Sequence, residues 1–183
     1  MRHIFCTHKY KDCVFTCNSA NNAVPFKAVK HFTRCLSHSC VTFDDNCVHC
    51  VVYSFNGFGE DIVNNEKIYI HDCDETNNLV NIGTLPSGSP CEINKIAIDA
   101  DLLVAEGFIE PHFFAGFSGG RKSVLPGVAG RRTVLANHCS EFIAHEKART
   151  GILEGNPIHC DMLWAAKTAK LAYIVNVILD SEK

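Results

Sequence analysis

The chain has 183 residues, of which 46% are hydrophobic and 20% charged, with a formal net charge of −3 and a sequence pI near 6.3. This length suits one ordinary domain with its own core, with or without a short appendage. The small negative charge gives no general attraction to nucleic acid or to an anionic membrane, so small-molecule chemistry is the better interpretation.

The N-terminal sequence predicts a cytoplasmic protein. No run of about 18 apolar residues could span a bilayer, and "MRHIFCTHKYKDC" lacks the apolar core and cleavage site of a secretory signal. Eleven cysteines would suit a secreted disulfide scaffold, but without a signal peptide a reducing compartment is expected. We therefore expect most of the cysteines to be free thiols.

A change of composition divides the chain into residues 1–56 and 57–183. All twelve glycines lie at Gly57 or later, whereas seven of the eleven cysteines lie at or before Cys50. The first segment has no clean hydrophobic period, apart from a helix-like stretch from Ala23 to Leu36. We treat it as a divergent cysteine-rich segment that precedes an α/β domain.

Three interpretations of residues 1–56 stay open. The cysteines could be ordinary buried residues of a divergent subdomain, or the segment could come from a shifted reading frame joined to a real domain. They could also be zinc ligands, because thiolates paired two to four residues apart can hold one tetrahedral ion. The candidate pairs are Cys13/Cys17, Cys35/Cys40 and Cys47/Cys50.

From about Phe58 onward, strand-like and helix-like patterns alternate. Such alternation predicts a mostly parallel, Rossmann-like sheet flanked by helices. Ligands bind such sheets at the carboxyl ends of the strands, and His112 follows one of them. The expected strands are "EKIYIHD" (66–72), "NLVNIG" (78–83), Leu102–Ile109 and "AYIVNVIL" (172–179), and the expected helices are "GRRTVLANHCSEFIAHEKA" (130–148) and "NPIHCDMLWAAKTAKL" (156–171).

The stretch "HFFAGFSGGRKS" (112–123) is the first chemical candidate. Three glycines in five positions, 116–120, add nothing to a core and cost backbone entropy, so they indicate a close approach to the backbone. A Walker A loop would need glycine before the lysine, where Arg121 stands. The loop could still present N–H groups to an anion, or be a tight turn carrying two solvated cations.

Two histidines flank this loop and form the second candidate. His112 follows a strand and His138 lies in a helical run, so both could face the loop that carries Lys122. His145 is seven residues after His138, hence on the same face of that helix, but its surroundings look solvated. His159 begins a helix and is expected at the surface or as a cap.

From Gly59 to the C-terminus, the sequence resembles the N-terminal domain of the nickel-pincer lactate racemase family. The resemblance rests on "EGFIEPHFFAGFSGGRKSVLPGVAG", on "ANH" and on "ARTGILEGNPIHCDMLWAAKTAKLAYIVNVIL". It implies a nickel ion in a pyridinium-derived pincer mononucleotide that is tethered covalently through Lys122. Ser118, Gly119 and Gly120 would let the loop approach this cofactor.

The resemblance also implies roles for the two histidines. His138 resembles the nickel ligand, and His112 resembles one of two acid/base histidines. Family members remove a hydride from C2 of a 2-hydroxy acid such as lactate and return it to the opposite face, while a histidine takes the hydroxyl proton. Such proton transfer is typically worth ~10²–10⁴-fold.

The chain departs from the family in two respects. The "GTHR"-like motif of the second histidine and the "TRP"-like motif for the substrate carboxylate are not recognisable, since the triplet at His8 lacks the glycine. The family's second domain is also absent, so we expect a truncated member with little activity by itself. The alternative function is a non-enzymatic module that binds a phosphate-bearing ligand or zinc. A nucleotide-hydrolysing P-loop protein fits less well because of Arg121.

Overall fold

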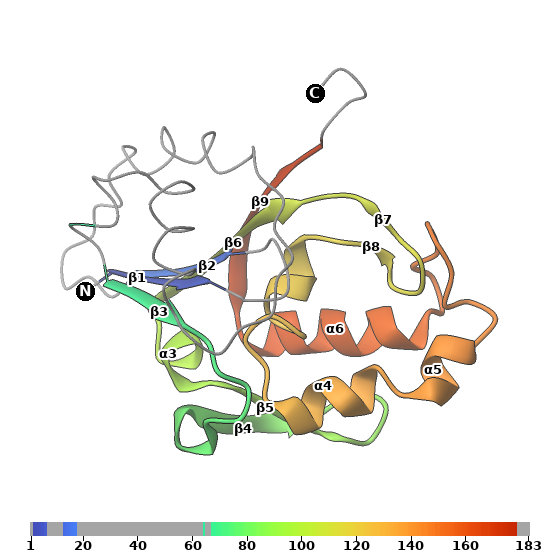
Figure 1. Ribbon diagram of the computed structural model, residues 1–183, viewed down its shortest axis with the longest axis horizontal. Coiled ribbons are helices and arrows are strands. Elements are labelled where there is room, and N and C mark those ends of the chain that lie inside the picture. Colours follow the sequence, from blue (N-terminus) through green and yellow to red (C-terminus); the bar gives the residue numbers. More distant parts are fainter. Residues whose placement is uncertain (1, 7–12, 18–63, 65–66, 179–183) are drawn as a thin grey trace, which may run out of the picture.

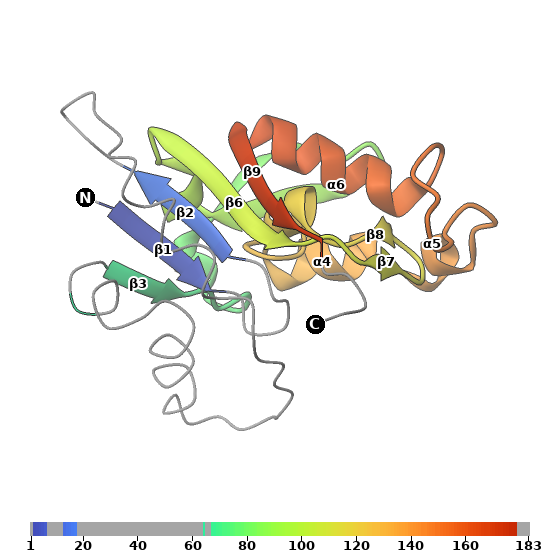
Figure 2. The same cartoon turned by 90° about the horizontal axis from the view of Figure 1, so that it is seen from above.

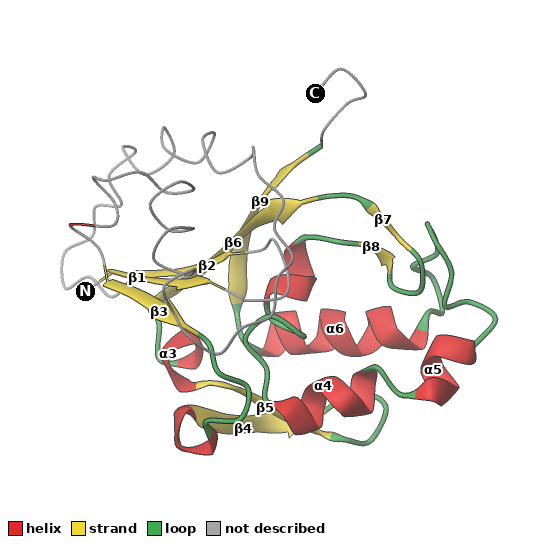
Figure 3. Ribbon diagram, viewed as in Figure 1, coloured by secondary structure: helices red, strands yellow, loops and turns green. Residues whose placement is uncertain are grey.

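A computed structural model describes residues 2–6, 13–17, 64 and 67–178 of the chain. A five-stranded sheet forms one layer, and helices lie along one side of it together with a separate two-stranded hairpin (Figures 1 and 3). Within these ranges, no helix has the length and apolar character needed to cross a bilayer.

The main sheet has the strand order β3, β1, β2, β6, β9, which Figure 2 shows from above. Its strands are β1 (Arg2–Cys6), β2 (Cys13–Cys17), β3 (Lys67–Ile70), β6 (Leu102–Phe108) and β9 (Leu171–Val177). The pairs β1–β3 and β6–β9 are parallel, whereas β2 is antiparallel to both β1 and β6. Four of the five strands therefore run in the same direction, which confirms the predicted α/β class with a mostly parallel sheet.

A separate hairpin lies on the same side of the main sheet as the helices (Figure 1). It consists of β4 (Leu79–Thr84) and β5 (Pro90–Asn94), and it is preceded by the short helix η2 (Thr76–Asn78) and followed by α3 (Lys95–Ile98). The side chain of Asn94 starts α3 by accepting the N–H of Ile96 at 3.0 Å. The sequence did not predict β5, because its proline, glutamate and asparagine obscure the alternation of its two buried apolar residues, Cys91 and Ile93.

The remaining elements lie between β6 and β9 in the sequence. They are β7 (Pro111–His112), β8 (Gly116–Phe117), η3 (Gly120–Ser123), α4 (Arg131–Asn137), α5 (Ser140–Ala144) and α6 (Pro157–Thr168). Asn156 caps α6 by accepting the N–H groups of Ile158 and His159, at 3.1 and 3.3 Å. Pro157 follows at the first helical position, where its missing N–H costs nothing.

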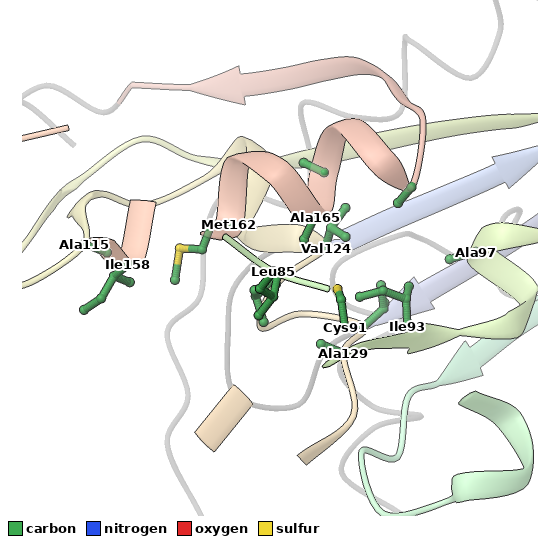
Figure 4. Packing of buried hydrophobic residues seen from close by; sticks show 14 of the residues in the cluster. Leu85, Cys91, Ile93, Ala97, Ala115, Val124, Ala129, Ile158, Met162 and Ala165 are labelled. Atoms are coloured by element: carbon green, nitrogen blue, oxygen red, sulfur yellow. The ribbon is translucent and has the colours of Figure 1, made fainter. Parts of the chain in front are cut away.

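The core forms where α6 meets β5 and the segment after η3 (Figure 4). Ile158, Met162 and Ala165 are fully buried at the spacing of one helical face. Cys91 and Ile93 alternate inward from β5 with the two-residue period of a strand. Cys91 is one of four cysteines whose side chains are described, and all four are free thiols, as expected.

Most of the predicted elements from residue 67 onward are confirmed, but the helix expected over residues 130–148 is wrong. It divides into α4 and α5, and His138 forms the C-cap of the first. Cys139 is extended, with φ −71° and ψ 157°, so the two helices do not share a face and the predicted alignment of His145 with His138 fails. The helix-like stretch from Ala23 to Leu36 and the candidate zinc cysteines Cys35, Cys40, Cys47 and Cys50 lie outside the described residues. The domain boundary near residue 57 stays a prediction.

Glu106 on β6 generates a prediction about stability. It is 7% exposed, and burial raises its pKa from 4.5 to about 7. The unfolded chain therefore releases this proton at lower pH than the native protein, and stability is lost as pH rises from about 4.5 to about 7. We expect Glu106→Gln to raise the free energy of unfolding at pH 8 by on the order of 2–3 kcal/mol, and to change it little at pH 4.5.

Urea denaturation at the two pH values measures this difference. The exposed Glu154→Gln is the matched control and should leave the pH dependence as in the wild type. An equal effect of Glu106→Gln at both pH values would contradict a buried, proton-bearing carboxyl.

Candidate functional site

The site is built on the segment that follows β6. Ile109 continues the sheet by donating its N–H to the Val177 carbonyl at 3.0 Å, and the chain then forms the β7–β8 hairpin. Ser118 closes the base of this hairpin, because its N–H donates to the Glu110 carbonyl at 2.9 Å and its hydroxyl accepts the Glu110 N–H at 2.8 Å. The hairpin is thereby held at the carboxyl end of β6, where a ligand was expected.

The glycines of the loop meet two different requirements. Gly116 has φ +79°, and a Cβ there would lie 2.5 Å from the Ile152 carbonyl oxygen. Gly119 and Gly120 have φ +72° and +55°, in the left-handed region that side chains disfavour. The Gly120 N–H donates to the Asn176 side-chain oxygen at 3.3 Å, so β9 helps to fix the loop. The sequence predicted that something approaches this backbone closely. In the structure, the segments around Ile152 and Asn176 of the same chain do so.

Lys122 lies in η3 and is 1% exposed, which makes it the largest of the fully buried side chains among the described residues. Its carbonyl accepts the Gly127 N–H at 3.0 Å, and its own N–H donates to the Gly119 carbonyl at 3.2 Å. Burial of an ammonium group is expensive. The alternative of a tight turn with two solvated cations is therefore wrong for this residue.

The Arg121 side chain binds the β7–β8 hairpin to the loop that follows it. Its guanidinium donates to the carbonyls of Ala115 and Phe117, at 2.8 and 3.1 Å. Both bonds come from one terminal nitrogen, Nη2, whose two N–H groups serve the two carbonyls. This clamp gives Arg121 a structural reason to stand where a Walker A loop has glycine.

His138 leaves the C-terminal end of α4 with one ring nitrogen engaged and the other buried. Its Nδ1 donates to the Val134 carbonyl at 3.2 Å, while Nε2 is buried and has no hydrogen-bond partner among the described residues. Burial lowers the pKa of the imidazole, and the positive charge of Lys122 lowers it further. The ring is therefore neutral, with its lone pair on Nε2, which is the form that binds a metal ion.

His112 sits in a group of aromatic rings. It stacks on Phe113 with 4.8 Å between ring centroids and meets the edge of Phe114 at 4.5 Å. Phe114 in turn meets His138 edge-on at 5.3 Å, so one phenyl ring contacts both histidines. This aromatic bridge fixes the two imidazoles relative to each other.

The protonation state of His112 follows from the same surroundings. Burial lowers its pKa to about 4, aided by the charges of Lys122, His138 and Arg121. Its Nδ1 faces the N–H groups of Phe114 and Ala115 at 3.5 and 3.3 Å, so the neutral ring carries its proton on Nε2 in this arrangement. Because Lys122 acts on the pKa of both histidines, the structure gathers the three predicted residues in one place.

Several residues near this site were not predicted from the sequence. His159 is neither a cap nor a plain surface residue, because Asn156 caps α6 and the His159 Nδ1 is buried without a partner in the described part of the chain. Burial and then Arg121 lower its pKa. Asn156 also donates to the Phe114 carbonyl at 2.8 Å, and the pair Asn156-Pro157 was the signal that could have identified the cap. Phe114 gave no such signal.

The fold and site define an α/β domain whose glycine-rich loop buries a lysine beside two neutral histidines. The protein-family model for the lactate racemase N-terminal domain matches residues 55–151 of this chain, which include the lysine and both histidines. The chain belongs to that family.

Curated lactate racemases are among its relatives. That of Thermoanaerobacterium thermosaccharolyticum is 66% identical over 124 residues, which cover 68% of this chain and 29% of the relative. That of Lactiplantibacillus plantarum is 62% identical over 128 residues, which cover 70% and 30%. This chain therefore spans about three tenths of the length of these relatives.

A solved structure agrees with these matches. The lactate racemase apoprotein of Thermoanaerobacterium thermosaccharolyticum superposes with a TM-score of 0.69 at 61% identity, over 72% of this chain and 32% of that one. Its likeness supports the mixed α/β arrangement described above.

The lowered pKa of the site histidines predicts sensitivity to acid. The unfolded chain takes up protons near pH 6.5, where the native His112 and His138 still exclude them, so stability is lost as pH falls below about 6.5. Each such group contributes a slope of up to about 1.4 kcal/mol per pH unit. We expect His112→Gln to lose less stability between pH 7 and pH 5 than the wild type does.

Thermal denaturation at both pH values is the measurement. His145→Gln, at an exposed position, is the control. Parallel pH profiles of His112→Gln and the wild type would show that His112 is not protected from protonation.

Proposed function

We propose that this chain forms the N-terminal part of a nickel-pincer-dependent racemase of 2-hydroxy acids, with lactate as the substrate. In this proposal Lys122 tethers the pincer mononucleotide, His138 binds its nickel and His112 exchanges a proton with the substrate. The names of the curated relatives support the substrate class. The cofactor and the residue roles are our inference from the chemistry of the site.

One observation carries the proposal: a buried lysine lies close enough to His138 to lower its pKa, and the Nε2 of that imidazole is buried without a partner among the described residues. A buried lone pair without a hydrogen bond costs free energy, unless a ligand completes it. A neutral imidazole is a good ligand for nickel, and a lysine amine is a group that can form a covalent amide-type bond. Both groups thus fit a metal-bearing nucleotide that is anchored at one end and coordinated at the other.

The glycine-rich loop supports the same assignment. Gly119 and Gly120 have left-handed conformations that favour glycine, so the turn that leads to Lys122 carries no side chain at these two positions. Ser118 holds the hairpin base, so its contribution to cofactor binding would be to position the loop.

When bound, the cofactor would supply a hydride acceptor for C2 of the substrate. His112 is suited to take the hydroxyl proton, because its lowered pKa keeps it neutral at physiological pH. To accept at Nε2, the ring must carry its own proton on Nδ1. The two N–H contacts to Nδ1 are long, at 3.3 and 3.5 Å, so they yield at little cost.

Mass spectrometry of protein co-expressed with the enzymes that build the cofactor tests the tether. We expect a covalent adduct on the peptide that contains Lys122, and none in Lys122→Arg, because a guanidinium cannot form the bond. Lys167→Arg, at an exposed position of α6, should keep the adduct. An adduct elsewhere, or none in the wild type, would contradict the proposal.

Metal analysis of the same preparations tests the ligand. We expect nickel in the wild type and in His145→Ala, and a loss of at least about 10-fold in His138→Ala, since a first ligand is removed. Zinc held through Cys35, Cys40, Cys47 and Cys50, with no nickel, would favour the alternative of a non-enzymatic binding module.

A further inference from the structure

A buried polar junction joins the end of α4 to α6, directly before His138. Asn137 is fully buried and Asp161 is 1% exposed. The Asn137 amide donates to the Ile158 carbonyl at 3.2 Å and to the Asp161 carboxylate at 3.4 Å. The other carboxylate oxygen accepts the N–H of Ser87 at 3.0 Å. One carboxylate therefore ties α4, α6 and the β4–β5 turn together.

The junction matters because α4 has little stability by itself. It has seven residues, and its N-cap, Gly130, offers no side-chain hydrogen bond. A helix of this length does not persist in water without tertiary contacts. Its last residue, Asn137, is held by α6, and the next residue, His138, turns out of the helix with φ −100° and ψ 32°.

The contact of Asn137 with α6 affects the orientation of the His138 imidazole. The His138 Nδ1 bonds to Val134, one turn back in the same helix, so the ring keeps its orientation only while the last turn of α4 stays intact. Asn137 is the residue of that turn that is fixed to another element. If the turn opens, Nδ1 loses its acceptor and the Nε2 lone pair loses its direction.

Thr133, nearer the start of α4, also fixes this helix to the core. It allows a role in positioning His138 to be distinguished from general support of the helix. Thr133 accepts the Glu92 N–H at 2.9 Å and donates to the Pro90 carbonyl at 3.1 Å, and it is fully buried. It fastens α4 to β5. Thr133 and Asn137 thus bind the same helix to the core, but only Asn137 adjoins His138.

We propose that Asn137 and Asp161 are positioning residues for His138: they hold the last turn of α4 on α6, so that Nε2 points at the ligand that it binds. The inference rests on the proposed function in taking a metal as that ligand. Hydrogen-bond partners of a metal-binding histidine typically change metal affinity by about 10–100-fold, and Asn137 would act on such a partner, the Val134 carbonyl, by holding the turn that carries it.

The test compares Asn137→Ala with Thr133→Val in the full chain. Nitrogen NMR of the histidine rings, without cofactor, reports the tautomer of His138. We expect the Nδ1–H form in the wild type and in Thr133→Val, and a mixture with the Nε2–H form in Asn137→Ala. In cofactor-loaded protein, nickel should dissociate about 10–100-fold faster into excess EDTA from Asn137→Ala, and within about 2-fold of the wild-type rate from Thr133→Val.

Asp161→Asn nearly preserves the volume of the side chain and provides the same two readouts if Asn137→Ala does not fold. It should give an intermediate result, because the amide can still accept the Ser87 N–H but presents no second anionic oxygen to Asn137. Equal tautomer populations in Asn137→Ala and Thr133→Val would overturn the positioning role, and so would equal nickel loss at a matched decrease in Tm. A wild-type protein that never holds nickel overturns the proposed function instead, and the tautomer comparison then decides the positioning role alone.

Discussion

Burial of the Lys122 amine is the constraint on which the rest of the site depends. A lysine that is 1% exposed needs a backbone that closes around its stem, and here η3 and the turn through Gly127 provide it. That closure requires left-handed conformations just before it, at Gly119 and Gly120, and the Arg121 clamp on the hairpin carbonyls. The glycine-rich sequence is thus explained first by the geometry of enclosing a lysine, and only then by access for a ligand.

The buried cation also sets the state of the two histidines. Desolvation is the largest cause of the lowered pKa at His112 and His138, and the charge of Lys122 comes second at both. Neutral imidazoles serve as a metal ligand and as a proton acceptor, whereas imidazolium serves as neither. Phe114 contacts both imidazole rings edge-on. Chemistry and acid sensitivity therefore have the same physical origin.

Strand and helix periodicity predicted much of the fold, and the motif around Lys122 pointed to the family. The α/β class, α6 and the strands β6 and β9 followed from hydrophobic patterns that depend on local sequence alone. The break between α4 and α5 could not be predicted in this way, because the Asn137 amide nitrogen donates to α6, more than twenty positions away along the chain. The burial of Lys122 and of the His159 Nδ1 were missed for the same reason: both depend on which distant segments close over them.

The site also depends on residues that lie beyond the 55–151 match. Asn176 of β9 accepts the Gly120 N–H, and the Ile152 carbonyl occupies the space that a side chain at Gly116 would need. Asn156 joins the start of α6 to the Phe114 carbonyl, and Asp161 joins the middle of that helix to Asn137. Each histidine is thus tied to α6, His112 through Phe114 and His138 through Asn137. The last helix and strand of the described chain are therefore part of what holds the loop and the two imidazoles in place, and a shorter piece that ended at residue 151 would lack these supports.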